Sequence, residues 1–423
     1  MAVFNGMKDS PLFFPVVLAI YILSSRLVMR CLSGMAREVV TALLNLAGSY
    51  SLFLNIPRHN MSGSVCSLLF IGYVGIVVFQ YLVLRFFSTS KNSWLIWLAF
   101  FCPIAFLISD RYTPNAVLAT FMKLAHVHAT HFSSIPHLIG ISYLTFRCSR
   151  LVLEVRNGSV KMPGIFEYLC FAFFLPTMSV GPINTYANHR RGFETLPWEV
   201  PLGRAALRIL VGLVKYQFLG AMFIQLTYSD FLLNGHPHHW IELPVAMIFY
   251  YLYLYCNFSG FCDMAIGAAA IIGIPVQENF DNPFAARNMK EFWNRWHITL
   301  SQWMRDIVFA PLSKWLVRAM GPANVNHAVA IAIFVVFLLI GIWHGVGWNY
   351  AIFGVFQALG VVATHYYSIG LKKWLGRDGF KEYNENRWIH ALAVITTFCY
   401  YAGTLFFFAN TLPEIREIFS ILR

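Results

Sequence analysis

The chain has 423 residues, of which 58% are apolar and only 12% are charged. A soluble domain carries about 25% charged residues, and the mean hydropathy of this chain is +0.59. These values exclude an ordinary soluble protein and predict an all-α, polytopic integral membrane protein. The net charge of +12 does not indicate a nucleic-acid partner, because Lys and Arg accumulate in the cytoplasmic loops of membrane proteins.

Long apolar runs divide the chain, which we treat as a single membrane domain over residues 1–423. At about 20 residues per span, they predict about 11 transmembrane helices, with re-entrant or interfacial helices around a central tunnel. In chain order, the candidate spans are 11–28, 39–56, 65–87, 94–109, a weaker region at 116–125 and 138–153, 166–183, 205–227, 241–258 with 261–274, 328–342, 350–366 and 390–408.

Basic residues in short loops set the predicted orientation. Arg26, Arg30 and Arg37 follow the first span and place that loop in the cytoplasm. Basic groups near the C-terminus belong on the same side: Lys314, Arg318, Lys372, Lys373, Arg377, Lys381 and Arg387. The apolar runs before and after residue 344 then form an out-and-back pair.

Residues 174–183, FLPTMSVGPI, do not fit a simple spanning helix. Pro176 and Pro182 bracket Gly181 in an apolar run, and each proline removes a backbone donor. Broken backbone at membrane depth is tolerated only where it is buried in protein or lines a cavity. The alternative is an ordinary helix end followed by a turn.

Residues 279–312 are too polar to span a membrane and predict a re-entrant or interfacial segment. Trp293, Trp296, Leu300 and Trp303 are separated by three, four and three positions, which places them on one face of a helix. Taken alone, this pattern is typical of an amphipathic interfacial helix. In that interpretation His297 lies on the polar face of the helix and has no functional role.

His344 stands in the sequence GIWHGVGWN at residues 341–349, in the break between two long apolar runs. An ionisable group at that depth is expensive, so it is a functional-site hypothesis. A neutral imidazole can serve as a base there, while a structural histidine bonded to a neighbouring helix is the open alternative. Asp263 is a second intramembrane candidate, and we expect it to pair with a basic group.

Other types of chemistry lack a local signature. The chain has no Gly-rich nucleotide loop and no Gly-x-Ser-x-Gly elbow. Its eight cysteines are scattered, without the spacing of a metal site. Two groups of histidines also occur, and no metal is expected at either. His126, His128, His131 and His137 do not share one helix face and have no carboxylate beside them. The second group, His236, His238 and His239, stands in a Gly-His-Pro-His-His sequence typical of a loop.

Residues 291–312, EFWNRWHITLSQWMRDIVFAPL, resemble a signature of the membrane-bound O-acyltransferases, in the branch of alginate O-acetyltransferase and the teichoic-acid D-alanyl transfer protein. GIWHG at 341–345 resembles the second signature of that family. Residues 255–284 and 174–183 are similar to two further family segments, so the resemblance covers 137–367 in the right order. The chain departs from the family at Asn257, where Asp is usual, and at Ser313-Lys314, where a Gly pair is frequent.

The resemblance implies catalytic roles for two histidines. His344 would be the general base on an acceptor hydroxyl. His297 would orient or polarise the acyl donor, or stabilise the oxyanion. The residues implied to shape the substrate tunnel are Trp293, Trp296, Ser301, Trp303, Arg305, Asp306, Trp343, Trp348 and Asn349.

We therefore expect a multi-pass enzyme of the cell (inner or cytoplasmic) membrane that passes an acyl group, acetyl first, from a cytoplasmic thioester towards hydroxyls of a cell-envelope polysaccharide. No bound cofactor is expected, and the donor substrate would be an acyl-CoA or acyl carrier protein thioester. The expected partners are that donor carrier, an extracytoplasmic partner acyltransferase and the lipid bilayer. The alternatives are D-alanyl transfer to teichoic acid or, in another class, a secondary transporter with His344 in a proton relay.

Overall fold

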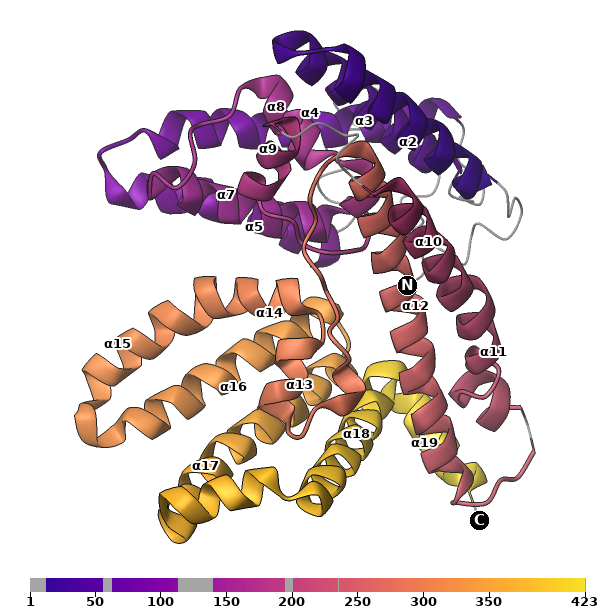
Figure 1. Ribbon diagram of the computed structural model, residues 1–423, viewed down its shortest axis with the longest axis vertical. Coiled ribbons are helices and arrows are strands. Elements are labelled where there is room, and N and C mark those ends of the chain that lie inside the picture. Colours follow the sequence, from indigo (N-terminus) through magenta and orange to yellow (C-terminus); the bar gives the residue numbers. More distant parts are fainter. Residues whose placement is uncertain (1–12, 56–62, 113–139, 195–200, 235, 423) are drawn as a thin grey trace. The chain divides into compact units, whose positions relative to one another are not determined.

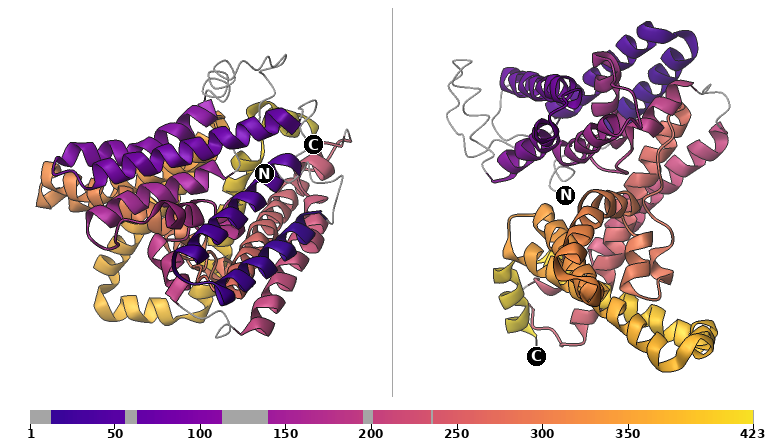
Figure 2. Two further views of the ribbon diagram at one scale, coloured as in Figure 1. Left: turned by 90° about the horizontal axis from the view of Figure 1, so that it is seen from above. Right: turned by 90° about the vertical axis from the view of Figure 1, so that its left-hand side faces the viewer.

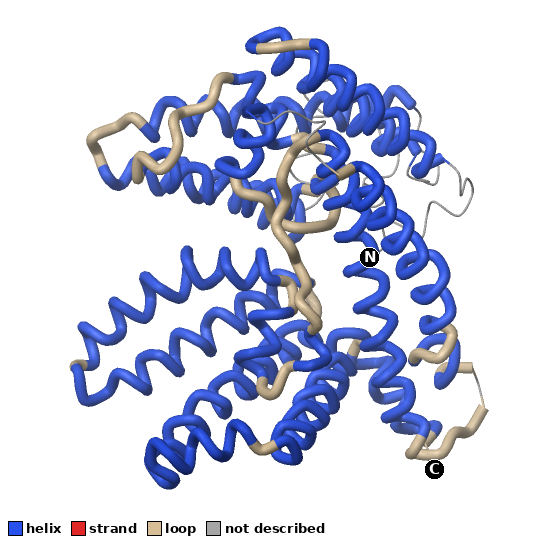
Figure 3. Tube along the Cα trace, viewed as in Figure 1, coloured by secondary structure: helices blue, strands red, loops and turns tan. Residues whose placement is uncertain are grey.

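The computed structural model describes residues 13–55, 63–112, 140–194, 201–234 and 236–422 (Figure 1). The weaker apolar region at 116–125 and the first histidine cluster lie outside the described residues. Within the described part, the elements are helices joined by loops, and two isolated bridges are the extended pairings (Figure 3). The predicted all-α class is confirmed.

The chain divides into two compact units. Unit 1 comprises residues 1–210 and 263–277, and unit 2 comprises residues 211–262 and 278–423. The boundary falls inside one long helix, α12 (Glu242–Ile272). The single membrane domain and the core at 137–367 stay predictions.

Unit 1 contains the helices of the N-terminal half. They are α2 (Phe13–Cys31), α3 (Gly34–Asn55), α4 (Gly63–Ser88), α5 (Ser93–Tyr112), α7 (Ile141–Arg156), α8 (Ile165–Ala172), α9 (Tyr186–Glu194) and most of α10 (Leu202–Leu213). Helix α5 packs between α4 and α7, and α8 packs on α3. Long aliphatic and aromatic side chains at helical spacing form these contacts, among them the buried residues Tyr73, Leu144 and Leu151.

In unit 1, the stretch at 174–183 is not a continuous helix. Helix α8 ends at Ala172, and a single 3-10 turn follows at Leu175–Thr177, so the expected span at 166–183 is wrong. Residues 174–178 are all buried, as broken backbone in a membrane protein must be. Arg147 satisfies two carbonyl groups at the end of α8, because its guanidinium donates to the carbonyl oxygens of Phe171 and Ala172 at 3.1 and 3.0 Å.

Unit 2 contains the C-terminal half. Its elements are α11 (Gly220–Ile224), most of α12, α13 (Met289–Arg295), α14 (Ile298–Met304), α15 (Ala310–Met320), α16 (Val325–His344), α17 (Trp348–Glu385), α18 (Arg387–Ala409) and α19 (Leu412–Ile421). One-turn π-helices occur at Val214–Leu219, Tyr228–Leu232 and Arg305–Phe309. Helices α15, α16 and α17 follow one another and pack side by side (Figure 1; Figure 2).

Helices α16 and α17 form the expected out-and-back pair. The first ends at His344 and the second begins at Trp348. Near the other end of the pair, the hydroxyl of Tyr366 lies 2.7 Å from Nδ1 of His327. His344 therefore lies at the turn between the two helices, at the opposite end of α16 from the basic residues of α15.

Seven helices of the described part are long and apolar enough to cross a membrane. They include α4, α5, α12, α16, α17 and α18. The runs at 241–258 and 261–274 prove to be one helix, α12. A polytopic membrane protein is confirmed, while the count of about 11 spans and the central tunnel stay predictions.

Candidate functional site

The segment at 279–312 is broken at its centre. Trp296 has extended dihedral angles, His297 has φ 44° and ψ 52°, and a second helix begins at Ile298. The expectation of one continuous helix face is therefore wrong. The reason is a competing pairing: Phe280 bridges Trp296, and the amide of Ile298 donates to the carbonyl oxygen of Asn279 at 3.0 Å.

His297 is held in this break by polar contacts. Its side chain is buried, and its Nδ1 lies 3.1 Å from Oδ1 of Asn279. That oxygen also accepts hydrogen bonds from the amide and hydroxyl of Thr299, at 3.2 and 2.9 Å. Burial and, to a smaller extent, the nearby His344 together lower the pKa of His297 from 6.5 to about 3. The imidazole is therefore neutral at physiological pH.

Aromatic rings join the two histidines. The ring of Phe258 lies 4.8 Å from that of His297, and the indole of Trp343 lies 6.4 Å away on an edge-to-face contact. Trp343 in turn lies 4.6 Å from the ring of His344. Phe408 covers His344 at 4.9 Å. The two imidazoles therefore share one aromatic environment inside unit 2.

Gly345, which follows His344, has a local explanation. A Cβ atom at this position would collide with the ring of Tyr350 at the start of α17. The ring of Tyr350 packs against the backbone of Gly345, and it also lies 5.5 Å from the ring of Phe408. Glycine is thus required here for close packing of the turn around His344.

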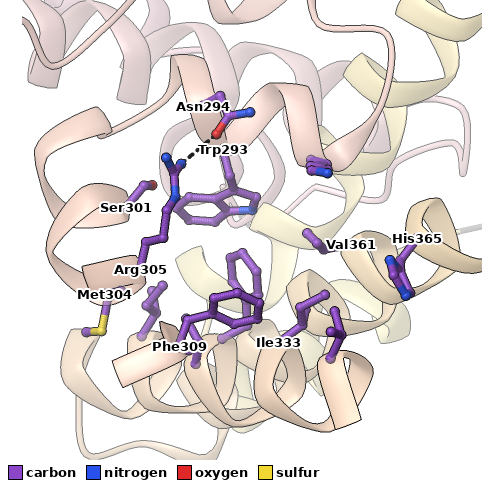
Figure 4. Close-up of a pocket in the computed structure, with 14 residues that line it drawn as sticks. Trp293, Asn294, Ser301, Met304, Arg305, Phe309, Ile333, Val361 and His365 are labelled. Carbon is purple, nitrogen blue, oxygen red and sulfur yellow. Dashed lines mark hydrogen bonds between the residues drawn. The ribbon is translucent and has the colours of Figure 1, made fainter. Parts of the chain in front are cut away.

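A pocket of about 430 Å³ is lined by residues of α13, α14, α16 and α17 (Figure 4). The indole of Trp293 projects into it, and Arg305 donates a hydrogen bond of 2.7 Å to Oδ1 of Asn294. Apolar side chains of α16, from Val329 to Ile340, form one wall.

Two residues that line the pocket are neighbours of the histidines along the chain. Its lining residue Ser301 is in the first turn of α14, and the amide of Ser301 donates to the carbonyl oxygen of His297 at 3.0 Å. Ile340 lines the pocket one helical turn before His344. One turn of helix rises about 5.4 Å, and the two histidines themselves are not among the lining residues.

The structure brings some of the expected residues together and separates others. Trp293, Ser301 and Arg305 line the pocket, and Trp343 lies between the histidines. Trp296 instead packs in an aromatic cluster, 5.6 Å from Phe292 and 5.4 Å from Tyr401. The remaining four lie apart from the pocket: Trp303 and Asn349 are buried, whereas Asp306 and Trp348 are exposed.

Four neighbours of this site were missed by sequence reasoning. Asn279 holds His297, Phe408 covers His344, and Lys290 and His365 line the pocket. Lys290 had a signal, since it is one of the basic residues in the segment at 279–312. Asn279 is the first residue of that same segment, whereas Phe408 and His365 approach from other helices and no local pattern marks them.

Comparisons with known proteins identify the family of this chain. The model of the membrane-bound O-acyltransferase family matches residues 82–404. The teichoic acid D-alanyltransferase of Streptococcus thermophilus is 30% identical over 76% of this chain and 77% of its own length. That of Bacillus subtilis is 29% identical over 88% of this chain and 93% of its own length.

Relatives that are O-acetyltransferases match over a smaller share of their own length. The peptidoglycan O-acetyltransferase of Helicobacter pylori is 26% identical over 71% of this chain and 62% of its length. A probable alginate O-acetylase of Pseudomonas aeruginosa is 28% identical over 52% of this chain and 41% of its length. The chain therefore belongs to the membrane-bound O-acyltransferase family and is a polytopic acyltransferase of the membrane.

Proposed function

We propose that this enzyme takes an acyl group from a cytoplasmic thioester and passes it to a hydroxyl acceptor on the outer side of the membrane. The observation that carries the proposal is the pocket beside α16, because two of its lining residues, Ser301 and Ile340, lie one helical turn along the chain from His297 and His344. A donor in the pocket and an acceptor at the turn between α16 and α17 would meet at this pair.

His344 is the proposed general base. It would take the proton of the acceptor hydroxyl as the oxygen attacks the thioester carbonyl. The C–S bond would then break, and the imidazolium would return the proton to the departing sulfur, which leaves as the thiol. His344 is the last residue of α16, and the partial negative charge of a helix C-terminus stabilises the imidazolium that a base becomes. His344 is half-buried, and the aromatic rings around it would limit the access of water to the thioester.

The pocket is proposed to hold the arm that carries the thioester. Coenzyme A and acyl carrier proteins share this arm, a narrow chain of amide and methylene groups that ends in a phosphate. The apolar wall of α16 suits the methylene groups, and Lys290 and Arg305 supply positive charge for an anionic donor. Substituting either by Gln is expected to raise the KM for the donor more than it lowers kcat.

For the acyl group, the comparisons favour D-alanyl over the acetyl group expected first. The two D-alanyltransferases align over 77% and 93% of their lengths, whereas the acetyltransferases align over 62% and 41%. We propose D-alanyl transfer towards teichoic acid or a similar polymer, with acetyl transfer as the second candidate because those relatives also match. The compared relatives are named for acyl transfer, which leaves the transporter hypothesis without support.

The proposed location is the cytoplasmic membrane, where an anionic carrier protein or coenzyme A reaches the basic side. An extracytoplasmic partner acyltransferase would complete the transfer to the polymer. Lys314 and Arg318 in α15 belong to the expected cytoplasmic face. This arrangement would separate donor and acceptor by the membrane.

The test is mass spectrometry of cell-envelope polymers from cells that express wild-type protein, His344→Ala or no protein. His327→Ala is the matched control, because it removes a histidine from the other end of the same helix. We expect the ester to be lost with His344→Ala and kept with His327→Ala at equal protein levels. The mass of the ester distinguishes D-alanyl from acetyl, and an ester retained by His344→Ala would contradict the catalytic assignment.

A further inference from the structure

The side-chain amide of Asn279 has an orientation that its neighbours determine. The atom closest to the backbone N–H of Thr299, at 3.2 Å, is Oδ1. A backbone N–H can only donate, so the facing atom of the amide must be the oxygen. On its other side, Nδ2 of Asn279 donates to Sγ of Cys262 at 3.4 Å, which is a weak acceptor.

This orientation decides which nitrogen of His297 carries a proton. Nδ1 of His297 lies 3.1 Å from Oδ1 of Asn279. Since that oxygen is an acceptor, Nδ1 must be the donor. The side chain of His297 is 3% exposed, and burial disfavours the imidazolium. The ring is therefore neutral, and its second nitrogen, Nε2, carries a lone pair.

Nε2 of His297 has no hydrogen-bond partner among the residues that the structure describes. Buried polar side-chain atoms usually have one. The ring stands against Phe258 and Trp343, in the aromatic environment that it shares with His344. A buried acceptor in such a position is suited to a donor group that arrives with the substrate.

We propose that Asn279 is a positioning residue that fixes His297 as the Nδ1–H tautomer, so that Nε2 accepts a hydrogen bond from an N–H or O–H group of the substrate. The identity of that substrate rests on the proposed function. The tautomer itself rests on the contacts of Asn279 alone.

This tautomer excludes one role that the resemblance implied for His297. An oxyanion is stabilised by hydrogen-bond donors, and Nε2 without a proton cannot donate. His297 therefore orients a substrate hydroxyl or amide from the acceptor side of the hydrogen bond. The donors for the oxyanion must come from other groups.

The experiment is ¹⁵N NMR of the full-length protein in lipid nanodiscs, with all histidines labelled. The chain has 14 histidines, so the signal of His297 is identified by its loss in His297→Gln. We expect a protonated Nδ1 and a bare Nε2 in the wild type between about pH 5 and about pH 8. Asn279→Leu should move the proton to Nε2. Thr299→Val is the matched control and should leave the tautomer unchanged, because its backbone N–H still orients Asn279.

A proton on Nε2 in the wild type would overturn the tautomer, and an unchanged spectrum in Asn279→Leu would overturn the positioning role. Asn279→Asp covers the case in which Asn279→Leu does not fold. Its carboxylate still accepts from Nδ1–H, so Nδ1 should stay protonated, and a bare Nδ1 beside it would contradict the proposal. None of these signals requires acyl transfer, so failure here is distinguishable from failure of the proposed function.

Discussion

In unit 1, Arg208 of α10 donates a hydrogen bond of 3.0 Å from Nε to Oδ1 of Asp263 in α12. The pairing that the sequence predicted for Asp263 is therefore confirmed. One turn further along α12, a Cβ atom at Gly267 would lie 2.7 Å from Cγ1 of Ile209. The charge pair thus forms where two apolar helices lie in close contact.

Replacing one partner of this ion pair should destabilise the protein more than replacing both. Arg208→Met leaves the carboxylate of Asp263 in an apolar helix, and Asp263→Leu leaves the guanidinium there. We expect each single change to lower the free energy of unfolding by about 1–3 kcal/mol, less than for a fully buried pair because both side chains are partly exposed. The double variant should recover part of that loss. Unfolding in detergent measures all three, and strictly additive losses would contradict the coupling.

Arg147 is a buried cation whose partners are neutral. It donates to the carbonyl oxygens of Phe171 and Ala172 and to the hydroxyl of Thr177. Arg147→Lys should destabilise unit 1 because an ammonium group cannot reproduce the planar fork, and Arg147→Met should do so by about 2–4 kcal/mol because buried carbonyls lose a charged donor. The readout is thermal unfolding in detergent.

Arg150→Met is the control for Arg147. It lies on the same helix and forms a partly exposed pair with Glu154 at 3.0 Å, which contributes at most about 1 kcal/mol. Equal losses at the two positions would show that Arg147 acts only as a general helix contact.

Several features could be predicted because their signals are local. The length of two apolar runs predicted the pair formed by α16 and α17. The prolines around Gly181 predicted broken backbone. Asp263 predicted a basic partner, since a lone carboxylate in an apolar helix is too costly. In each case the physical cause lies within a few residues of the pattern.

The break at His297 could not be predicted in this way. The spacing of Trp293, Trp296 and Leu300 is helical, and nothing beside His297 contradicts a helix. The deciding pairing is with Asn279 and Phe280, which are non-local in sequence. The same limit applies to Phe408, which reaches His344 from another helix. The sequence identified both histidines as candidate residues, but it did not contain the environment that orients them.

The backbones of α16 and α17 touch at two glycines. A Cβ atom at Gly341 would collide with the carbonyl oxygen of Tyr350 and lie 2.9 Å from Cα of Gly354. Gly341→Val should therefore separate the helices and lower stability by about 1–3 kcal/mol. Because His344 lies three residues further on, acyl transfer should fall further than the loss of folded protein explains.

Gly370→Val is the matched control for this change. Gly370 lies in α17, and no atom lies within 4 Å of the position of its Cβ. It should leave both protein level and activity close to the wild type. Comparable losses in the two variants would mean that valine disturbs these helices regardless of the close contact.

His189 should make unit 1 sensitive to acid. Its ring is buried among Phe171, Phe174 and Phe193 at 5.2–5.6 Å, and neither ring nitrogen has a hydrogen-bond partner in the described part of the chain. Burial lowers the pKa of His189 from 6.5 to about 3, and the charge of Arg147 acts in the same direction.

The unfolded chain therefore binds a proton at His189 below pH 6.5, whereas the folded chain binds it only near pH 3. Between these values the unfolded state holds more protons, so stability falls with falling pH, by up to about 1.4 kcal/mol per pH unit from this residue. Above pH 6.5 His189 adds nothing to the pH dependence of stability.

His189→Leu removes the proton site and keeps an apolar side chain in the aromatic pocket. Thermal unfolding at pH 8 and pH 5 should show a smaller loss of Tm for His189→Leu than for the wild type. The contribution of His297 is the same in both proteins and cancels in this comparison, so parallel curves would mean that His189 is protonated alike in the folded and unfolded chains.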